Sequence, residues 1–171
     1  GCTVLKRLIE RHGDVNYVYL ADLARVPYGV KSSSEIRTIA HEIVDWMNEQ
    51  DLDAVLIACN TTNSLALDIV ENFSEVPVYG LIEAVPEMLS GQKIGVLATP
   101  STVASKAYTN QILSFNPNAF VLEQACPAFV PMIETGQLNT NEIRKIAVEY
   151  MKPLLDAGVE EVILGCSHYP L

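Results

Sequence analysis

The sequence predicts an α/β protein made of two similar lobes, each a mainly parallel sheet between helices in three layers. Short apolar runs rich in β-branched residues alternate along the whole chain with segments whose apolar residues recur every three or four positions. The short runs are apolar throughout rather than at every second position, which is typical of parallel strands buried on both faces. Strands joined through helices favour right-handed crossover connections.

Two segments have the apolar spacing of amphipathic helices. The first covers residues 32–50, and Ser32 followed by Glu35 predicts a capping box at its start. The second begins at Asn139 and ends just before Gly158, a residue type that commonly stops helices. Each helix has one apolar face, so each should pack against other elements of the core.

Six short runs are expected to form the strands. Their continuous apolar character fits strands that are covered on both faces. The predicted strands are Val15–Leu20, Ala54–Ala58, Val76–Gly80, Ile94–Ala98, Ala119–Leu122 and Glu161–Leu164.

Two of these strands end in the same way. Residues 53–61 lead through an apolar strand to Cys59 and then to small polar residues, and residues 160–168 do the same around Cys166. One cysteine at the end of a buried strand is more often a packing residue, because cysteine is among the most buried residue types. Two cysteines in matching contexts favour a shared function and a chain of two similar halves.

The repeat predicts two lobes that face one another across an active site. We place their boundary near Ile82, which gives a first lobe over residues 1–82 and a second over residues 83–171. The chain begins without the strand expected before Gly1 and ends without a closing helix. We therefore expect it to be part of a longer protein.

Composition disfavours several classes of protein. The 171 residues include 11 Lys and Arg against 21 Asp and Glu, and the net charge of −10 disfavours binding to nucleic acids. No apolar run approaches the ~18 residues that a membrane-spanning helix needs, and no signal segment is visible. Four cysteines without a C-x-x-C pair argue against a disulfide scaffold and against a metal site. Reduced thiols in a cytoplasmic protein are the simplest interpretation.

The two cysteines lie where parallel sheets bind ligands, beyond the carboxyl ends of their strands. A helix that begins after Cys59 should lower the pKa of this thiol and attract a carboxylate. His168 could relay a proton to or from Cys166. Racemisation at carbon needs a base on one face of the substrate and an acid on the other, and a thiol with a pKa near the working pH suits both tasks. No lysine context for pyridoxal phosphate and no nucleotide loop stands out, so we expect no cofactor.

Three motifs in this order and spacing resemble those of glutamate racemases, members of the cofactor-independent aspartate/glutamate racemase family. They are Val26-Pro-Tyr-Gly29, Ala58-Cys-Asn-Thr-Thr62 and Gly165-Cys-Ser-His-Tyr-Pro-Leu171. The resemblance covers the whole chain. It implies an isomerase that interconverts L- and D-glutamate and supplies D-glutamate for the peptidoglycan of the bacterial cell wall.

The resemblance also implies roles for individual residues. It implies that Cys59 and Cys166 are the two catalytic acid/bases, one for each enantiomer. The residues that would bind the substrate are Tyr28, Gly29, Asn60, Thr61, Ser167 and His168, with Asn60 and Thr61 on the carboxylate. Thr99, Thr102 and Glu134 are further candidates by the same comparison.

The chain departs from the family pattern at its start. Such racemases have a strand and an Asp-Ser-Gly turn upstream of the position of Gly1, and a later segment that returns to complete the first lobe. From this comparison, we expect the 171-residue chain alone to fold poorly and to lack activity.

Two alternatives stay open beside glutamate racemisation. One is a relative that acts on another substrate, such as an aspartate or hydantoin racemase or a one-cysteine decarboxylase; the presence of two matched thiols disfavours the decarboxylase. The other is a fragment that keeps the motifs without activity. The expected partner is a small-molecule substrate, with neither nucleic acid nor membrane, and a homodimer is an open alternative.

Overall fold

The structure is a computed structural model that describes all residues from 1 to 171. Its helices are α1 (Cys2–Arg11), α2 (Ser33–Asn48), α3 (Asn60–Phe73), α4 (Pro100–Ser105), α5 (Ala107–Phe115), α6 (Phe129–Glu134) and α7 (Asn141–Asp156), with short 3-10 turns η1 (Tyr28–Val30) and η2 (Pro86–Met88). Its strands are β1 (Val55–Leu56), β2 (Val78–Tyr79), β3 (Lys93–Ala98), β4 (Phe120–Ala125) and β5 (Glu161–Gly165).

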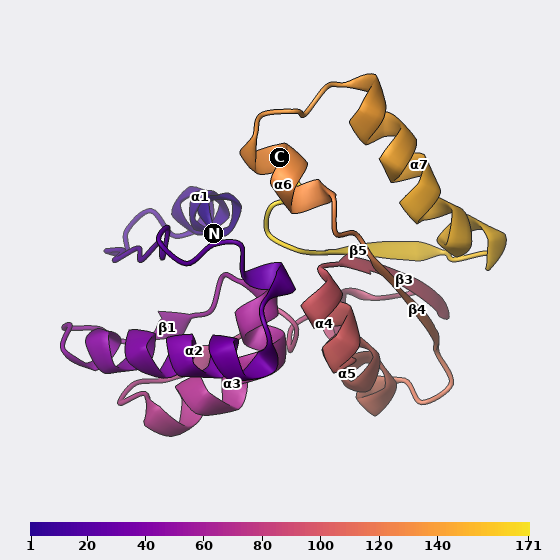
Figure 1. The fold of residues 1–171 in the computed structure, drawn as a ribbon. Coiled ribbons are helices and arrows are strands. Elements are labelled where there is room, and N and C mark those ends of the chain that lie inside the picture. The colour runs from indigo at the N-terminus through magenta and orange to yellow at the C-terminus, as the bar shows by residue number, and fades with distance from the viewer.

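The strands form two parallel sheets, which confirms the predicted fold class. Strands β1 and β2 pair in parallel, and the other sheet has the order β4-β3-β5 with both pairings parallel. Figure 1 shows the elements as two groups side by side. We call β1, β2, α2 and α3, with the loop before α2, the first lobe, and β3–β5 with α4–α7 the second lobe.

The second lobe has its sheet between two layers of helices. Ile94 and Val96 point to the α5 side, where they form a core cluster with Tyr108 and Ile112. Neighbouring Gly95 lies against Leu154 of α7 so closely that an added Cβ would be 2.5 Å from a leucine methyl carbon. Successive side chains of β3 therefore point to opposite faces of the sheet, one towards α5 and the next towards α7, as the two-residue period of a strand requires.

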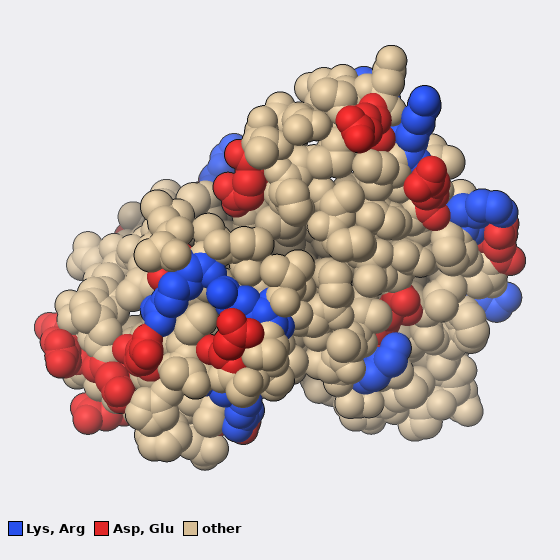
Figure 2. Space-filling model, in the orientation of Figure 1, with Lys and Arg blue, Asp and Glu red and all other residues tan.

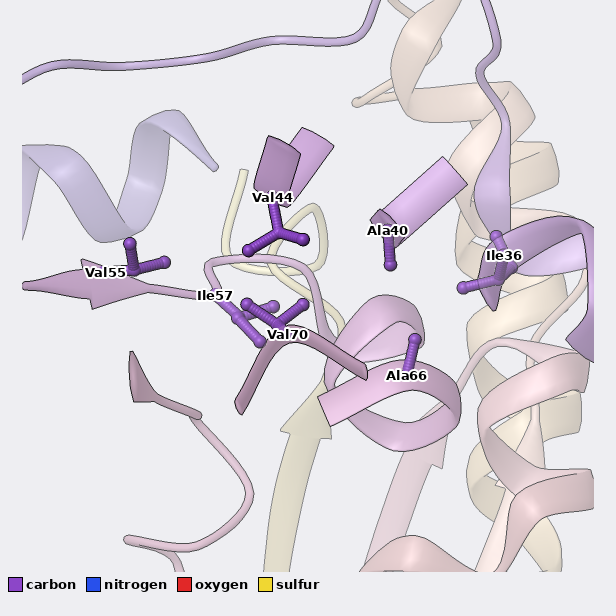
Figure 3. Close-up of a cluster of buried hydrophobic side chains, with 7 residues drawn as sticks. All are labelled: Ile36, Ala40, Val44, Val55, Ile57, Ala66 and Val70. Carbon is purple, nitrogen blue, oxygen red and sulfur yellow. The ribbon is translucent and has the colours of Figure 1, made fainter. Parts of the chain in front are cut away.

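The core of the first lobe joins α2 and α3 to one face of β1 (Figure 3). Its buried side chains are Ile36, Ala40, Val44, Val55, Ile57, Ala66 and Val70. The four-residue steps within each helix place these side chains on one stripe. The predicted capping box of α2 is present, since Ser32 accepts from the Glu35 backbone and Glu35 accepts from the Ser32 backbone. The outer residue Tyr79 of β2 stays 60% exposed.

Two local predictions were wrong. Residues 15–20 form no strand: Val18 is 61% exposed, and no other strand pairs with this segment. A strand needs a neighbour for its backbone hydrogen bonds, and apolar composition does not supply one. Helix α7 begins two residues later than predicted, because Thr140 rather than Asn139 caps it by accepting from the Ile143 N–H. Gly158 follows its end with φ of +67°, as predicted for a stop.

The distribution of charged side chains on the surface agrees with the composition. On the face drawn in Figure 2, acidic and basic side chains are interspersed over both lobes, and no large basic patch is visible there. No helix is both long and apolar enough to cross a bilayer. Ile82, near which we predict the boundary between the lobes, packs in the core of the second lobe beside Ile94. The division at residue 82 stays a prediction.

Candidate active site

Cys59 lies between β1 and α3, at the N-cap position of the helix. Strand β1 ends at Leu56, so the chain turns into α3 at the carboxyl edge of the first sheet. The free N–H groups at the start of a helix attract anions, and the thiol of Cys59 is half-buried beside them. This placement is the one predicted from the sequence.

The first residues of α3 are polar and buried, which is unusual for a helix that packs in a core. Asn60 is 6% exposed and Thr61 is 3% exposed. The Asn60 side chain accepts a hydrogen bond from the Tyr108 hydroxyl at 2.7 Å, and the Thr61 hydroxyl lies 3.0 Å from that of Thr99. Both partners belong to the second lobe. The start of α3 is therefore held by contacts between the lobes.

Cys166 follows β5 at the carboxyl edge of the second sheet and is buried. Burial raises the pKa of its thiol from 9.0 to about 11, and a negative charge on Cys59 adds to this rise. The expectation of a thiol pKa near the working pH is thus wrong for Cys166, because the sequence pattern does not reveal how fully the thiol is enclosed. Cys59 and Cys166 thus lie at the carboxyl edges of different sheets, one in each lobe.

His168 and Glu134 extend from Cys166 as a chain of proton-transfer groups. The His168 Nδ1 atom lies 3.7 Å from the Cys166 sulfur, and its Nε2 atom lies 2.6 Å from the Glu134 carboxylate. A carboxylate on one ring nitrogen orients the imidazole and favours a proton on that nitrogen. The other nitrogen can then accept a proton from the thiol. Sequence resemblance implied both residues, and the structure brings them together.

We expect the free energy of unfolding to fall as the pH rises from about 9 towards about 11. The unfolded chain loses the Cys166 proton near pH 9.0, whereas the folded protein keeps it up to about pH 11. In this interval the folded state binds more protons, so raising the pH favours unfolding by about 1.4 kcal/mol per pH unit for one such group. Urea unfolding of the full-length protein at about pH 8 and about pH 10 measures the loss.

The matched variant for this measurement is Cys166→Ser. Buried Cys126, with its pKa raised to about 12, remains in both proteins. It therefore contributes equally to the pH dependence of the free energy of unfolding in the parent and in the variant. The variant should therefore lose less stability than the parent over the same interval. An equal loss in both proteins would contradict the burial of a protonated Cys166.

The loop with Tyr28 and Gly29 reaches the second lobe at Thr99. A Cβ added to Gly29 would lie 2.6 Å from Thr99 Cγ2, so only glycine fits this approach. The Ser101 hydroxyl donates to the carbonyl oxygens of Gly29 and Lys31, at 2.9 Å each. The loop is thus held against the start of α4, beside a small pocket. The pocket is lined by Pro27, Gly29, Val30, Thr99, Pro100, Cys126, Pro127, Val130 and Pro131.

Tyr28 is held from its other side. Its hydroxyl donates to the Asp22 carboxylate, which also accepts from Arg25. Burial and this carboxylate raise the pKa of Tyr28, and a charge on Cys59 contributes in the same direction. The role of Tyr28 in lining the substrate site, which the resemblance implied, stays a prediction. Asp22 was not among the sequence candidates, because one acidic residue in a loop carries no motif.

Three buried threonines form a hydroxyl cluster between the lobes. Thr102 lies 3.0 Å from Thr99 and 3.4 Å from Thr61, measured between the hydroxyl oxygens. Thr99 also caps α4 by accepting from the Thr102 N–H. Ser167 is held through both of its oxygens, since its hydroxyl accepts from the Gly1 nitrogen at 3.2 Å and its carbonyl accepts from the Thr3 hydroxyl at 2.7 Å. Of the predicted site residues, Gly29, Asn60 and Thr61 of the first lobe contact the second lobe.

Tyr108 is the functional candidate that the sequence did not reveal. It lies on α5 with 2% of its surface exposed, and its spacing in the chain is that of an ordinary core residue of an amphipathic helix. Only the three-dimensional contact with Asn60 distinguishes it. No group of three or more His, Cys, Asp or Glu side chains is placed to hold a metal ion.

Comparisons with known proteins agree with this geometry. The family model for Asp/Glu/hydantoin racemases matches residues 2–171. A glutamate racemase of Prochlorococcus marinus (strain NATL1A) is 53% identical over all 171 residues, and one of Synechococcus sp. (strain CC9605) is 52% identical over the same length. The chain spans 64% of the length of each of these relatives.

A solved structure has nearly the same fold. The glutamate racemase of Francisella tularensis, in complex with D-glutamate, superposes with a TM-score of 0.95 at 36% identity, over 98% of this chain and 64% of that chain. The match over the whole of the chain, together with the paired cysteines at matching strand ends, assigns the chain to the Asp/Glu/hydantoin racemase family.

Proposed function

We propose that the protein interconverts L- and D-glutamate by moving the α-proton between two thiols, without a cofactor. The observation that carries this proposal is the placement of Cys59 and Cys166 on different lobes, each after a parallel strand, with Tyr108 hydrogen-bonded to Asn60 beside the first thiol and packed on Gly165 beside the second. A substrate held between the lobes then has one thiol on each face of its α-carbon. No single sheet edge could supply both faces.

Each turnover uses the thiols in opposite roles. The thiolate on one face takes the proton from the α-carbon, and the electron pair of that C–H bond remains on the substrate as a carbanion. The thiol on the other face then gives its proton to the same carbon, which inverts the configuration. Because both groups are cysteines, the reverse reaction exchanges the roles, and each cysteine serves one enantiomer.

His168 and Glu134 assist the thiol with the raised pKa. Cys166 must lose its proton before it acts as a base, and the His168 nitrogen 3.7 Å away can take it. Glu134 stabilises the imidazolium that forms, since its carboxylate lies 2.6 Å from the other ring nitrogen. The ammonium group of an amino-acid substrate adds a positive charge that favours both thiolates.

The substrate carboxylate fits the start of α3. Asn60 and Thr61 lie in its first turn, where the helix offers free N–H groups and partial positive charge. Ser167 and His168 approach from the second lobe, and Tyr28 and Gly29 close the site from the loop before α2. Local donors of this kind offset the net charge of −10, which disfavours anions at long range.

The relatives support glutamate over the related substrates. The most similar proteins named above are glutamate racemases, and the Francisella structure holds D-glutamate. We therefore propose glutamate as the substrate, with aspartate or a hydantoin as the alternative. The proposed role is to supply D-glutamate for peptidoglycan, in the cytoplasm. A homodimer is a further proposal, tested by the mass of the full-length protein in solution.

Exchange of the α-proton in deuterated water tests the activity. The full-length protein should replace the α-proton of both D- and L-glutamate by deuterium, and of aspartate far more slowly, as seen by NMR. Exchange with another acid but not with glutamate would favour a relative with different specificity. The 171-residue chain alone should show little exchange and no cooperative melt; robust activity of this chain would contradict that expectation.

A further inference from the structure

Tyr108 connects the two cysteine-bearing segments of the site. Its hydroxyl donates to the Asn60 side-chain oxygen at 2.7 Å, next to Cys59 in the chain. Its ring lies against Gly165, where an added Cβ would be 3.0 Å from the ring, next to Cys166. Tyr108 is 2% exposed, so any influence that it has on a substrate passes through these neighbours.

The contact with Asn60 fixes which end of the side-chain amide faces the site. The oxygen accepts from Tyr108, while the amide nitrogen Nδ2 makes no hydrogen bond within the protein. Among the buried side-chain nitrogen and oxygen atoms, only Glu123 Oε2 has no hydrogen-bond partner. Asn60 Nδ2 has no partner either, so this atom is not fully buried and must contact solvent. The N–H₂ group of Asn60 is therefore accessible to solvent at the start of α3, beside Cys59.

We infer that Tyr108 is a positioning residue that holds the Asn60 amide with its N–H₂ group towards the substrate carboxylate. The two ends of an amide have nearly the same shape, and a rotated side chain would present its oxygen to the carboxylate and repel it. Tyr108 disfavours that rotation because its buried hydroxyl proton has the Asn60 oxygen as its acceptor, and a rotated amide could donate to the hydroxyl oxygen but would leave this proton unpaired. The inference rests on the proposed binding of a carboxylate at Asn60.

The hydroxyl remains a donor at every working pH. Burial raises the pKa of Tyr108 above its ordinary value of 10.0, and the charges of Cys166 and Glu83 act in the same direction. A tyrosinate, which has no proton to donate to the Asn60 oxygen and would accept from the rotated amide instead, is therefore disfavoured in the folded protein. The orientation of Asn60 is thus set by a group whose protonation does not change during turnover.

The test is Tyr108→Phe in the full-length protein, which removes the hydroxyl and leaves the ring against Gly165. We expect KM to rise about tenfold for both enantiomers while kcat changes less than about threefold, the signature of lost substrate binding. In an Asn60→Ala background the same change should have no further effect on kcat/KM, because no amide remains to be oriented. Tyr150→Phe, which removes a half-buried hydroxyl of α7 that accepts from the Ala128 N–H, is the control for stability.

A second readout does not depend on activity. The side-chain amide signals of Asn60, identified by their loss in Asn60→Ala, should shift in the NMR spectrum of Tyr108→Phe without substrate. The inference would be overturned, with the proposed function left intact, by an unchanged KM in Tyr108→Phe. It would also be overturned if Tyr108→Phe lowered kcat/KM as much in the Asn60→Ala background as in the parent protein. If the parent protein neither binds nor exchanges glutamate, the proposed function has failed, and the role of Tyr108 towards substrate fails with it.

Discussion

Cys59→Ser and Cys166→Ser are each expected to abolish α-proton exchange for one enantiomer of glutamate and to preserve it for the other. The two variants should affect opposite enantiomers. In the proposed mechanism each thiol faces one side of the α-carbon, so only one enantiomer offers its α-proton to a given cysteine. The remaining thiolate can still remove the proton of the other enantiomer and return a deuteron from solvent.

The size of the loss follows from the chemistry of the hydroxyl group. Serine is a far weaker acid than cysteine, and its alkoxide is not formed at neutral pH, so it cannot serve as the base. General acid–base catalysis of this kind contributes about 10²–10⁴-fold to a rate. Loss of exchange by such a factor with one enantiomer, followed by NMR in deuterated water for each enantiomer separately, is the expected result. Full racemisation should be lost in both variants, because inversion needs both faces.

Cys2→Ser is the matched control for these variants. Cys2 is exposed on α1, and its sulfur donates only to the Tyr19 hydroxyl at 3.5 Å. Its replacement should leave exchange with both enantiomers unchanged. If Cys59→Ser and Cys166→Ser each slowed exchange of both enantiomers equally, the assignment of one thiol to each face would be contradicted.

The parts of the fold that the sequence predicted are those fixed by local pattern. The stripe of apolar residues and the Ser32–Glu35 pair define α2 without reference to the rest of the chain. Strand β3 is also found, because residues 94–98 are buried on both faces and must be apolar throughout. The segment 15–20 has similar composition but no partner strand, and strand pairing between distant segments leaves no local signal.

The same distinction applies to the site. Cys59 and Cys166 are recognisable because each combines a strand end with small polar residues, and the motifs carry Asn60, Thr61 and His168 with them. The contacts of Tyr108 with Asn60, and of Thr61 with Thr99, depend on how the lobes pack together. The raised pKa of Cys166 likewise depends on burial by distant residues. The sequence did not predict these features because they depend on residues that are close in space but distant in the chain.

Gly29→Ala is expected to raise KM for both enantiomers by about 100-fold. The added Cβ would lie 2.6 Å from Thr99 Cγ2 and 2.7 Å from Thr99 Cβ, closer than carbon atoms pack. Thr99 cannot move aside easily, because its hydroxyl caps α4 and joins the cluster with Thr61 and Thr102. The loop before α2 must therefore shift, and a shift of about 1 Å at substrate-positioning groups costs about 10²-fold. Steady-state kinetics in both directions measures the effect.

A second substitution distinguishes this steric mechanism from general damage. Thr99→Ser removes Cγ2, the atom nearest to the added Cβ, and keeps the hydroxyl that caps α4, so it should recover part of the lost affinity when combined with Gly29→Ala. Gly13→Ala is the control, since its added Cβ would meet only the Ile9 carbonyl oxygen, at 3.3 Å. A double variant no better than Gly29→Ala would show that the contact with Cγ2 does not limit the loss, and that the approach to Thr99 Cβ, at 2.7 Å, or damage elsewhere in the loop does. Partial recovery would show that the close approach of Gly29 to the Thr99 methyl group accounts for part of the lost affinity.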